Sequence, residues 1–433
     1  MTPLTAGLIG TGMLFVALFS GMPIGIVMGL IAFGGFAFVK DFGAALGLLQ
    51  VVPYDTFASY DMSVIPLFIL MGEFAFHAGL SADLYSAVQS WFGRMRGGLA
   101  MATIGGCAGF AAVCGSSVAT AATMGTVALP EMRRRGYDPA LATGCIAAGG
   151  TLGILIPPSI GFIVYGVITQ TSIGKLFLAG FLPGLLVAGL FIGTIYIICR
   201  LNPQAGPPGD STSIGEKLAA VKKTWMVVAL FLFVIGGIYI GIFTPTEAAG
   251  VGAFTTFVLG VVRRRLGWQA VKTSVLNTSK ATGMIFLILL GAVLFSYFLS
   301  LSGVPGAVAS TIGGLAINRY LVLAIIVIIY LILGCIMDAL AMILITLPIF
   351  FPLIAQLGFD PVWFGIIVTL TAEAGLISPP VGMNVFVIQG ISNGVPMYTI
   401  FRGIWPFFVA LLVGLLVLTV FPQIALVLPN LMS

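Results

Sequence analysis

Two short segments in the first half of the chain combine hydroxyl groups with residues that interrupt helices. Residues 114–120 read CGSSVAT and lie inside the apolar stretch 99–130, whereas residues 148–159 read AGGTLGILIPPS. Three glycines and a Pro-Pro pair cannot all sit in one regular helix. Interrupted helices leave backbone N–H and C=O groups unpaired, and these groups, with the hydroxyls, suit a Na⁺ ion or a carboxylate. Small-residue helix packing and a simple proline kink are the structural alternatives.

The second half of the chain repeats both segments and adds acidic residues. The apolar stretch 320–352 contains Asp338, and residues 371–384 read TAEAGLISPPVGMN, which includes Glu373. A carboxylate inside a long apolar stretch is costly to bury and marks a functional position by default. Asp338 and Glu373 could each act as a cation ligand or as an anchor for backbone N–H groups, and the sequence favours neither role.

The composition shows which class of protein must position these groups. Of the 433 residues, 60% are hydrophobic and 7% are charged, whereas an ordinary soluble domain carries about 25% charged residues. Such a chain cannot cover a water-facing surface, so a soluble enzyme, a nucleic-acid binder and a disordered protein are excluded. A spanning helix needs about 20 apolar residues. The long, continuous apolar runs therefore predict an all-α polytopic protein embedded in lipid, with its five cysteines as buried small hydrophobic residues.

The apolar runs divide into full spans and shorter re-entrant elements. Ten full spans are expected, at about residues 5–20, 23–39, 63–80, 140–168, 179–199, 226–243, 246–262, 281–300, 362–391 and 403–427. The stretches 99–130 and 320–352 are small or polar in the middle, and we expect both to be hairpins that enter the membrane and return. Spans 140–168 and 362–391 are expected to be broken helices. The polar segment 201–224, rich in Pro, Gly and Ser, is expected to link residues 1–200 to residues 225–433.

The two halves align at a constant offset of 222 residues. Seven identities fall within 29 ungapped positions, beginning with Pro130 against Pro352 and ending with Pro158 against Pro380. The identities are prolines, glycines and an aspartate, which determine the backbone at turns and breaks. The alignment therefore predicts an internal duplication, which is typical of secondary transporters.

The distribution of basic residues predicts that the two copies have opposite orientations. The segment after the first hairpin reads EMRRRGYDP, and its counterpart, IAQLGFDP, lacks the three arginines. We place both chain ends outside and let neither hairpin cross the membrane. Fifteen of the 18 Lys and Arg residues then face the cytoplasm, and only Lys40, Lys175 and Arg319 lie outside. This distribution follows the positive-inside rule, so the net charge of +5 reflects how the chain is oriented in the membrane.

Several long motifs resemble a known transporter family. The segments GSSVATAATMGTVALPEMRRRGYDP, GTLGILIPPSIGFIVYG, SIGKLFLAGFLPGLL, TPTEAAGVGAF and EAGLISPPVGMNVFV are similar to the large membrane subunit, DctM type, of tripartite ATP-independent periplasmic (TRAP) transporters. The resemblance covers nearly the whole chain. It implies a Na⁺-driven elevator-type importer of an organic acid, such as a sialic acid or a dicarboxylate, in the bacterial inner membrane. It also implies two partners: a periplasmic substrate-binding protein (DctP type) and a separate small four-helix membrane subunit (DctQ type).

The resemblance also implies about two Na⁺ sites and a substrate site between the hairpin tips, with no organic cofactor. The first Na⁺ site would use Gly115, Ser116, Ser117, Gly149, Gly153 and Pro157. The second would use Asp338, Glu373, Gly375, Pro379 and Asn384. Substrate would contact Ser116, Ser117, Thr120, Ser159 and Asn384. Neither tip nor broken helix contains an arginine, so an acid would meet helix N-termini, hydroxyls and Asn384 instead.

Three other functions compete with this interpretation. A stand-alone Na⁺/dicarboxylate carrier of similar inverted-repeat build would transport without partner subunits. An intramembrane enzyme needs a nucleophile–base pair or a metal set, and a single histidine, His77, without an HExxH motif argues against one. A channel is possible, but paired hairpins that meet at the midplane suit alternating access better.

The inverted orientation can be tested by labelling. We expect single cysteines at Arg134 and Gln356, placed in a variant without the native cysteines, to react with a membrane-impermeant maleimide from opposite sides. Right-side-out and inside-out vesicles distinguish the two sides. Labelling of both positions from one side would rule out the inverted repeat.

Overall fold

The computed structural model describes all residues except 19–20, 210–212, 315–317 and 433. The described residues form α-helices, one 3₁₀ turn and connecting loops, and no β-strand occurs among them. The first half contains α1 (Pro3–Leu18), α2 (Ile24–Val39), α3 (Phe42–Phe57), η1 (Tyr60–Ser63), α4 (Val64–His77), α5 (Leu80–Phe92), α6 (Gly98–Cys114), α7 (Ser117–Arg134), α8 (Pro139–Gly150), α9 (Leu152–Leu155), α10 (Ile160–Thr169) and α11 (Ile173–Leu201). The second half contains α12 (Ile214–Tyr239), α13 (Pro245–Val262), α14 (Trp268–Ser302), α15 (Val304–Gly314), α16 (Arg319–Gly334), α17 (Ala339–Gln356), α18 (Pro361–Ile377), α19 (Met383–Ile391), α20 (Met397–Val420) and α21 (Gln423–Asn430).

Helix bounds in the two halves follow the offset found in the sequence. A shift of 222 residues carries the bounds of α7 onto those of α17, and it carries α10 to within one residue of α19. The caps correspond as well. Asp138 and Asp360 each accept a backbone hydrogen bond at the start of α8 and α18, and each precedes a proline at the first helical position, where the missing N–H costs nothing.

Six helical segments among the described residues are long and apolar enough to cross a membrane. They are Pro139–Thr169, Ile173–Leu201, Pro245–Val262, Trp268–Ser302, Ala339–Gln356 and Met397–Val420. The pair Phe42–Phe57 and Tyr60–His77, which is bent by 57°, gives a seventh if it counts as one span. Helices α1 and α2 have 16 residues each, which falls short of the usual length. Ten full spans therefore remain a prediction.

Two parts of the sequence interpretation differ from the structure. Residues 42–57, left outside the expected spans, form the helix α3, which Asp41 caps by accepting from the N–H of Ala44. The expected linker 201–224 is shorter, because α12 begins at Ile214, where Ser213 and Glu216 form a capping box. Residues 19–20 of the first expected span and 210–212 of the linker lie outside the described residues.

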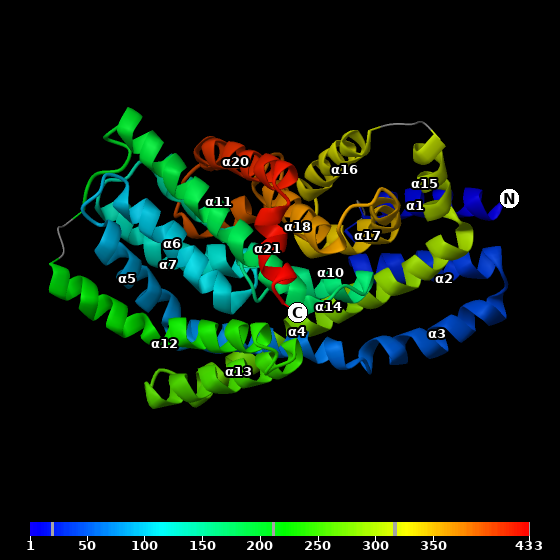
Figure 1. Ribbon diagram of the computed structural model, residues 1–433, viewed down its shortest axis with the longest axis horizontal. Helices are drawn as coiled ribbons and strands as arrows, with labels where there is room; N and C mark the ends of the chain where they lie inside the picture. Colours follow the sequence, from blue (N-terminus) through cyan, green and yellow to red (C-terminus); the bar gives the residue numbers. More distant parts are fainter. Residues whose placement is uncertain (19–20, 210–212, 315–317, 433) are drawn as a thin grey trace.

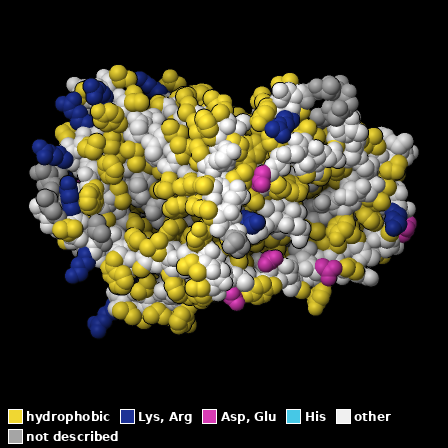
Figure 2. All heavy atoms as spheres, viewed as in Figure 1, with side chains coloured by type: hydrophobic (Ala, Val, Ile, Leu, Met, Phe, Trp, Pro, Cys, Tyr) yellow, Lys and Arg dark blue, Asp and Glu magenta, His cyan; other side chains and the backbone are white. Residues whose placement is uncertain are grey.

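The two hairpins lie toward opposite ends of the long axis. Figure 1 shows α6 and α7 on one side of the centre and α16 and α17 on the other, with α3, α12 and α13 along one long edge. On the face shown in Figure 2, most Lys and Arg side chains gather at the end that holds α5, α6 and α7. This distribution agrees with the cytoplasmic assignment of the first hairpin, and the inverted orientation itself stays a prediction.

The two halves interleave at the centre. Helix α19 of the second half packs against α7 and α8 of the first, and α10 of the first half packs against α17 and α18 of the second. The Tyr165 hydroxyl on α10 donates a hydrogen bond to the Pro361 carbonyl, 2.6 Å away, at the start of α18. Each broken helix therefore rests on the hairpin of the other half.

Helices α8 and α20 approach so closely that their backbones touch. A Cβ atom at Gly144 would collide with the Gly403 carbonyl group, and one at Gly403 would collide with the carbonyl of Ala140. We expect Gly403→Val to destabilise the protein by about 1–3 kcal/mol, because backbone atoms cannot move aside as side chains do. The melting temperature of the purified protein measures this loss. Gly193→Val is the matched control, since no atom lies within 4 Å of its added Cβ; equal melting temperatures would contradict the expectation.

Candidate functional site

The tip of the first hairpin lies directly on the break of the first broken helix. Gly115, with φ +64°, connects α6 to α7, and its carbonyl accepts a hydrogen bond from the Ile160 N–H at 3.4 Å. Gly153 sits against the backbone of Ser116 and Ser117, where a Cβ atom would have no room. The structure thus brings together Gly115, Ser116, Ser117 and Gly153, four candidates for the first Na⁺ site.

The remaining first-half candidates cap helices, form the break or pack between helices. Ser116 and Ser159 cap α7 and α10 by accepting from the N–H groups of Ala119 and Phe162. Pro157 is buried and is joined to Pro158 by a cis peptide bond. Gly149 packs against Cys107 of α6, so its small size serves helix packing.

The second tip and break also meet through glycine. A Cβ atom at Gly334, at the end of α16, would lie 2.9 Å from the Cα of Gly375. The Cys335 sulfur lies 2.9 Å from the Ser378 hydroxyl, which joins the same tip to the same break. Asp338 is half-buried and caps α17, with a carboxylate oxygen accepting from the N–H of Leu340 at 3.0 Å. The anchor role left open by the sequence is therefore the one that Asp338 fills in this structure.

The two breaks differ in their exposure. Pro379 and Pro380, also joined by a cis bond, are exposed, whereas Pro157 and Pro158 are buried. Gly382, with φ +62°, precedes α19, and no side chain caps that helix. The second break is thus the more open of the two.

Two further hydrogen bonds connect the halves, beside Gly150. The Ser117 hydroxyl on α7 donates to a Glu373 carboxylate oxygen on α18 at 2.5 Å. The Asn384 side-chain amide on α19 donates to the Ala147 carbonyl on α8 at 3.2 Å. Gly150 lies between them, because a Cβ there would be 3.1 Å from both the Ser117 carbonyl oxygen and the Asn384 amide nitrogen. The family resemblance implies that Ser117 belongs to one Na⁺ site and Glu373 and Asn384 to the other, whereas the structure makes the three residues neighbours.

Several oxygens in this region have no hydrogen-bond partner among the described residues. They are the second carboxylate oxygen of Glu373, the side-chain oxygen of Asn384 and the Thr120 hydroxyl. All three side chains have an exposed fraction of 0%. The salt bridges found in the described part of the chain involve neither Glu373 nor Asp338. Buried carboxyl, amide and hydroxyl oxygens without a basic neighbour suit a hard monovalent cation.

Four helices begin at these tips and breaks. They are α7, α10, α17 and α19, two from each half. The N-terminus of a helix carries a partial positive charge and unpaired N–H groups. The region therefore offers oxygen ligands to a cation and helix N-termini to an anion.

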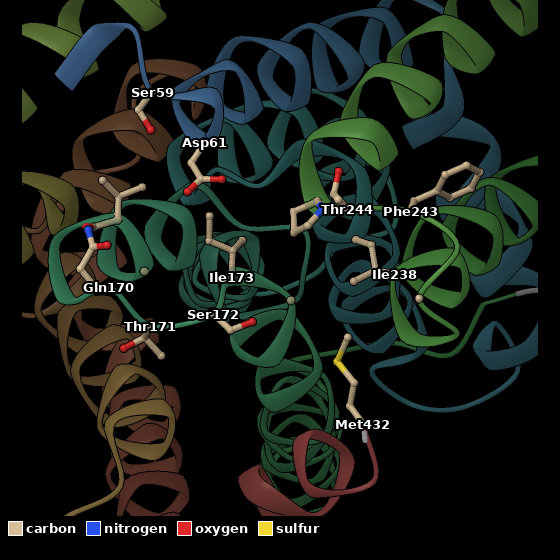
Figure 3. Close-up of a pocket in the computed structure, with 15 residues that line it drawn as sticks. Ser59, Asp61, Gln170, Thr171, Ser172, Ile173, Ile238, Phe243, Thr244 and Met432 are labelled. Atoms are coloured by element: carbon tan, nitrogen blue, oxygen red, sulfur yellow. The ribbon is translucent and has the colours of Figure 1, made fainter. Parts of the chain in front are cut away.

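A sizeable hollow lies elsewhere in the described part of the chain. It has a volume of about 550 Å³ and is formed where the α10–α11 turn, the α12–α13 turn and the start of η1 meet. Figure 3 shows Ser59, Asp61, Gln170, Thr171, Ser172 and Thr244 around it. None of the predicted site residues lines it, so it is separate from the tips and breaks.

Sequence reasoning missed the groups that complete the central contact. Ala147 contributes only a carbonyl and has no distinctive side chain. Gly150 belongs to the glycine run that was singled out, but the offset pairs it with Ala372 and so gives no sign of its contact with Asn384. The Cys335–Ser378 contact likewise has no counterpart in the first half.

Comparisons with known proteins agree with this architecture. Residues 11–424 match the family model described as the tripartite ATP-independent periplasmic transporter, DctM component. The chain is 39% identical over 383 residues to the C4-dicarboxylate TRAP transporter large permease protein of Pseudomonas aeruginosa, covering 88% of this chain and 89% of the relative. It is 31% identical over 415 residues to the sialic acid TRAP transporter large permease protein of Vibrio cholerae, covering 96% of each.

Solved structures show the same fold at low sequence identity. The YdaH transporter of Alcanivorax borkumensis superposes with a TM-score of 0.63 and 14% identity, covering 89% of this chain and 88% of that one. MtrF of Neisseria gonorrhoeae has a TM-score of 0.56 and 13% identity, with coverages of 98% and 95%. These likenesses concern the fold alone.

The contact between Ser117 and Glu373 can be measured through stability. Ser117→Ala removes the donor and leaves a buried carboxylate oxygen unpaired, which we expect to cost about 1–3 kcal/mol. Ser86→Ala is the matched control, because that exposed serine bonds only to its own helix. Thermal unfolding in detergent should show a lower melting temperature for the first variant only. In the Glu373→Met background, which has no acceptor, Ser117→Ala should cost less, because the two changes remove one shared interaction; additive effects would contradict this pairing.

Proposed function

The chain belongs to the DctM component family of the tripartite ATP-independent periplasmic transporters, and we propose that it couples the inward movement of Na⁺ to import of an organic acid. As a large permease subunit it is a multi-pass membrane protein. The proposal adds a bacterial inner-membrane location, a sialic acid or a dicarboxylate as substrate, delivery by a periplasmic binding protein and a small membrane subunit as partner.

The group of buried oxygens around Glu373 supports Na⁺ coupling best. Its carboxylate is fully buried and one of its oxygens is bonded only to the Ser117 hydroxyl. Burying a charge without a compensating partner is expensive. A Na⁺ ion beside the second carboxylate oxygen, with the side-chain oxygen of Asn384 nearby, would supply the missing charge. Ca²⁺ normally gathers more carboxylates, and soft metals prefer Cys or His.

An anionic substrate would interact with the helix N-termini of this region. The helix N-termini of α7, α10, α17 and α19 present partial positive charge without a lysine or arginine. The more open second break, with the uncapped start of α19, offers N–H groups to a carboxylate. Ser116, Ser159 and Thr120 add hydroxyls, two of them at helix caps.

Transport by such a site would depend on the interleaved halves moving together. Because α19 packs on α7 and α8, and α10 on α17 and α18, the two tips and two breaks form one body. An elevator-type motion of that body would carry Na⁺ and substrate across the membrane. Each Na⁺ that moves inward through about 100 mV gains about 2.3 kcal/mol. Two Na⁺ ions would therefore offset the charge of a dianion, and the membrane potential would not oppose its import.

Reconstituted uptake tests the proposal. The chain is combined with its small subunit and its binding protein, and a Na⁺ gradient is compared with a proton gradient at equal membrane potential. Uptake should require Na⁺ and should rise more steeply than first order with its concentration. Uptake driven by protons in Na⁺-free buffer would overturn the coupling, and uptake by the chain alone would favour a stand-alone carrier.

Two variants separate charge from structure in the same assay. Asp338→Asn keeps an efficient helix cap and removes the charge, whereas Asp338→Ala removes both. If the charge serves ion or substrate binding, both variants should lose uptake although the protein inserts and folds. Glu373→Gln should also lose uptake, and Glu216→Gln on exposed α12 is the control. Undiminished uptake in Asp338→Asn would leave that residue with its capping role alone.

A further inference from the structure

A cavity of about 410 Å³ lies where the end of α11 meets the turn between α5 and α6. Its lining residues are Met95, Arg96, Tyr196, Cys199 and Arg200. Two of the five are arginines, and none is acidic. The cavity is distinct from the tips and breaks, and no step of the proposed transport uses it.

The two guanidinium groups have no acidic partner within the described part of the chain. Arg200 donates one hydrogen bond, to the Tyr196 hydroxyl at 3.0 Å. The salt bridges of four other arginines in the described part go to Glu131 and Asp83. Both Arg96 and Arg200 are exposed. Two adjacent guanidinium groups without a carboxylate attract an anion, and their planar donors match the oxygens of a phosphate.

The surroundings of the cavity are apolar and face outward. Met95 is 41% exposed, Ile197 is 58% exposed and Leu201 is 82% exposed. These side chains belong to or adjoin α11, a span of 29 residues with high hydropathy. Tyr196, 45% exposed, and Trp91, 56% exposed, are residues typical of the membrane–water interface. The arginines therefore stand where lipid headgroups would lie, and the apolar side chains stand where acyl chains would lie.

The cavity also marks a junction of three chain segments. Cys199 packs against Gly97 and Gly206, where added Cβ atoms would lie 2.7 Å from its sulfur. The Gly97 N–H donates to the Gly206 carbonyl at 2.9 Å. These contacts beside the cavity hold three segments together: the end of α11, the α5–α6 turn and the beginning of the connection to the second half.

We infer that Arg96 and Arg200 bind the phosphodiester of an anionic phospholipid in this cavity, with the acyl chains along the exposed face of α11. The location at the basic end of the molecule (Figure 2) agrees with the side on which anionic headgroups attract basic residues. A bound lipid would brace the junction between the two halves of the chain.

Native mass spectrometry of the purified chain tests the inference without any transport measurement, so its outcome does not depend on the proposed function. The protein is exchanged into micelles that contain equal amounts of phosphatidylglycerol and phosphatidylcholine. We expect phosphatidylglycerol to be retained with at least about tenfold preference, as two charge-assisted contacts imply. The pair Arg96→Gln and Arg200→Gln should lose that preference. The control pair, Arg94→Gln and Arg264→Gln, removes the same charge from exposed arginines outside the cavity and should keep it.

A second pair of variants keeps the test decisive if the glutamine pair does not fold. Arg96→Lys with Arg200→Lys preserves the charge but not the planar donors, and it should bind phosphatidylglycerol more weakly than the native chain. Equal retention of both lipids, or equal loss in the control pair, would overturn the inference. Displacement of phosphatidylglycerol by millimolar inorganic phosphate would show a free-phosphate site, and would overturn the lipid assignment too.

Discussion

The Glu373 carboxyl group is buried at the centre of the protein, and no basic side chain among the described residues pairs with it. Much of the surrounding structure serves to satisfy this group. The Ser117 hydroxyl satisfies one of its oxygens, and this contact requires α7 and α18 to meet. Helix α7 can reach α18 only because Gly115 and Gly153 let the first tip lie flat on its break. A buried acid thus accounts for the small residues around it as well as for the hydrogen bond.

The interleaving of the halves has a related cause. A broken helix at membrane depth exposes backbone groups that lipid cannot satisfy. Each break is covered by the tip of its own hairpin, and the short helix that follows it packs on the hairpin of the other half. Each half therefore covers its own break but needs the other half to cover the short helix that follows it. The Ser117–Glu373 and Asn384–Ala147 hydrogen bonds join two halves that already depend on each other.

Sequence reasoning predicted the local elements well and the contacts between halves poorly. The offset of 222 residues carries the bounds of α7 onto α17, because prolines, glycines and capping aspartates act on nearby backbone. The same offset aligns Ser116 with Asp338, and the family resemblance assigns these two residues to separate Na⁺ sites. No local signal shows that Ser117 faces Glu373, 256 positions away. The helix α3 was not predicted, because Pro53 and Asp55 interrupt its apolar pattern.

The unequal exposure of the two Pro-Pro pairs bears on how a duplicated gene can diverge. Pro157 and Pro158 are enclosed by packed side chains, whereas Pro379 and Pro380 are exposed. A substitution beside the first pair must preserve a filled volume, but one beside the second need only preserve the interruption of the helix. The two pairs therefore place unequal constraints on the residues beside them. Among descendants of this gene, the neighbours of the second pair should accept more residue types than the neighbours of the first.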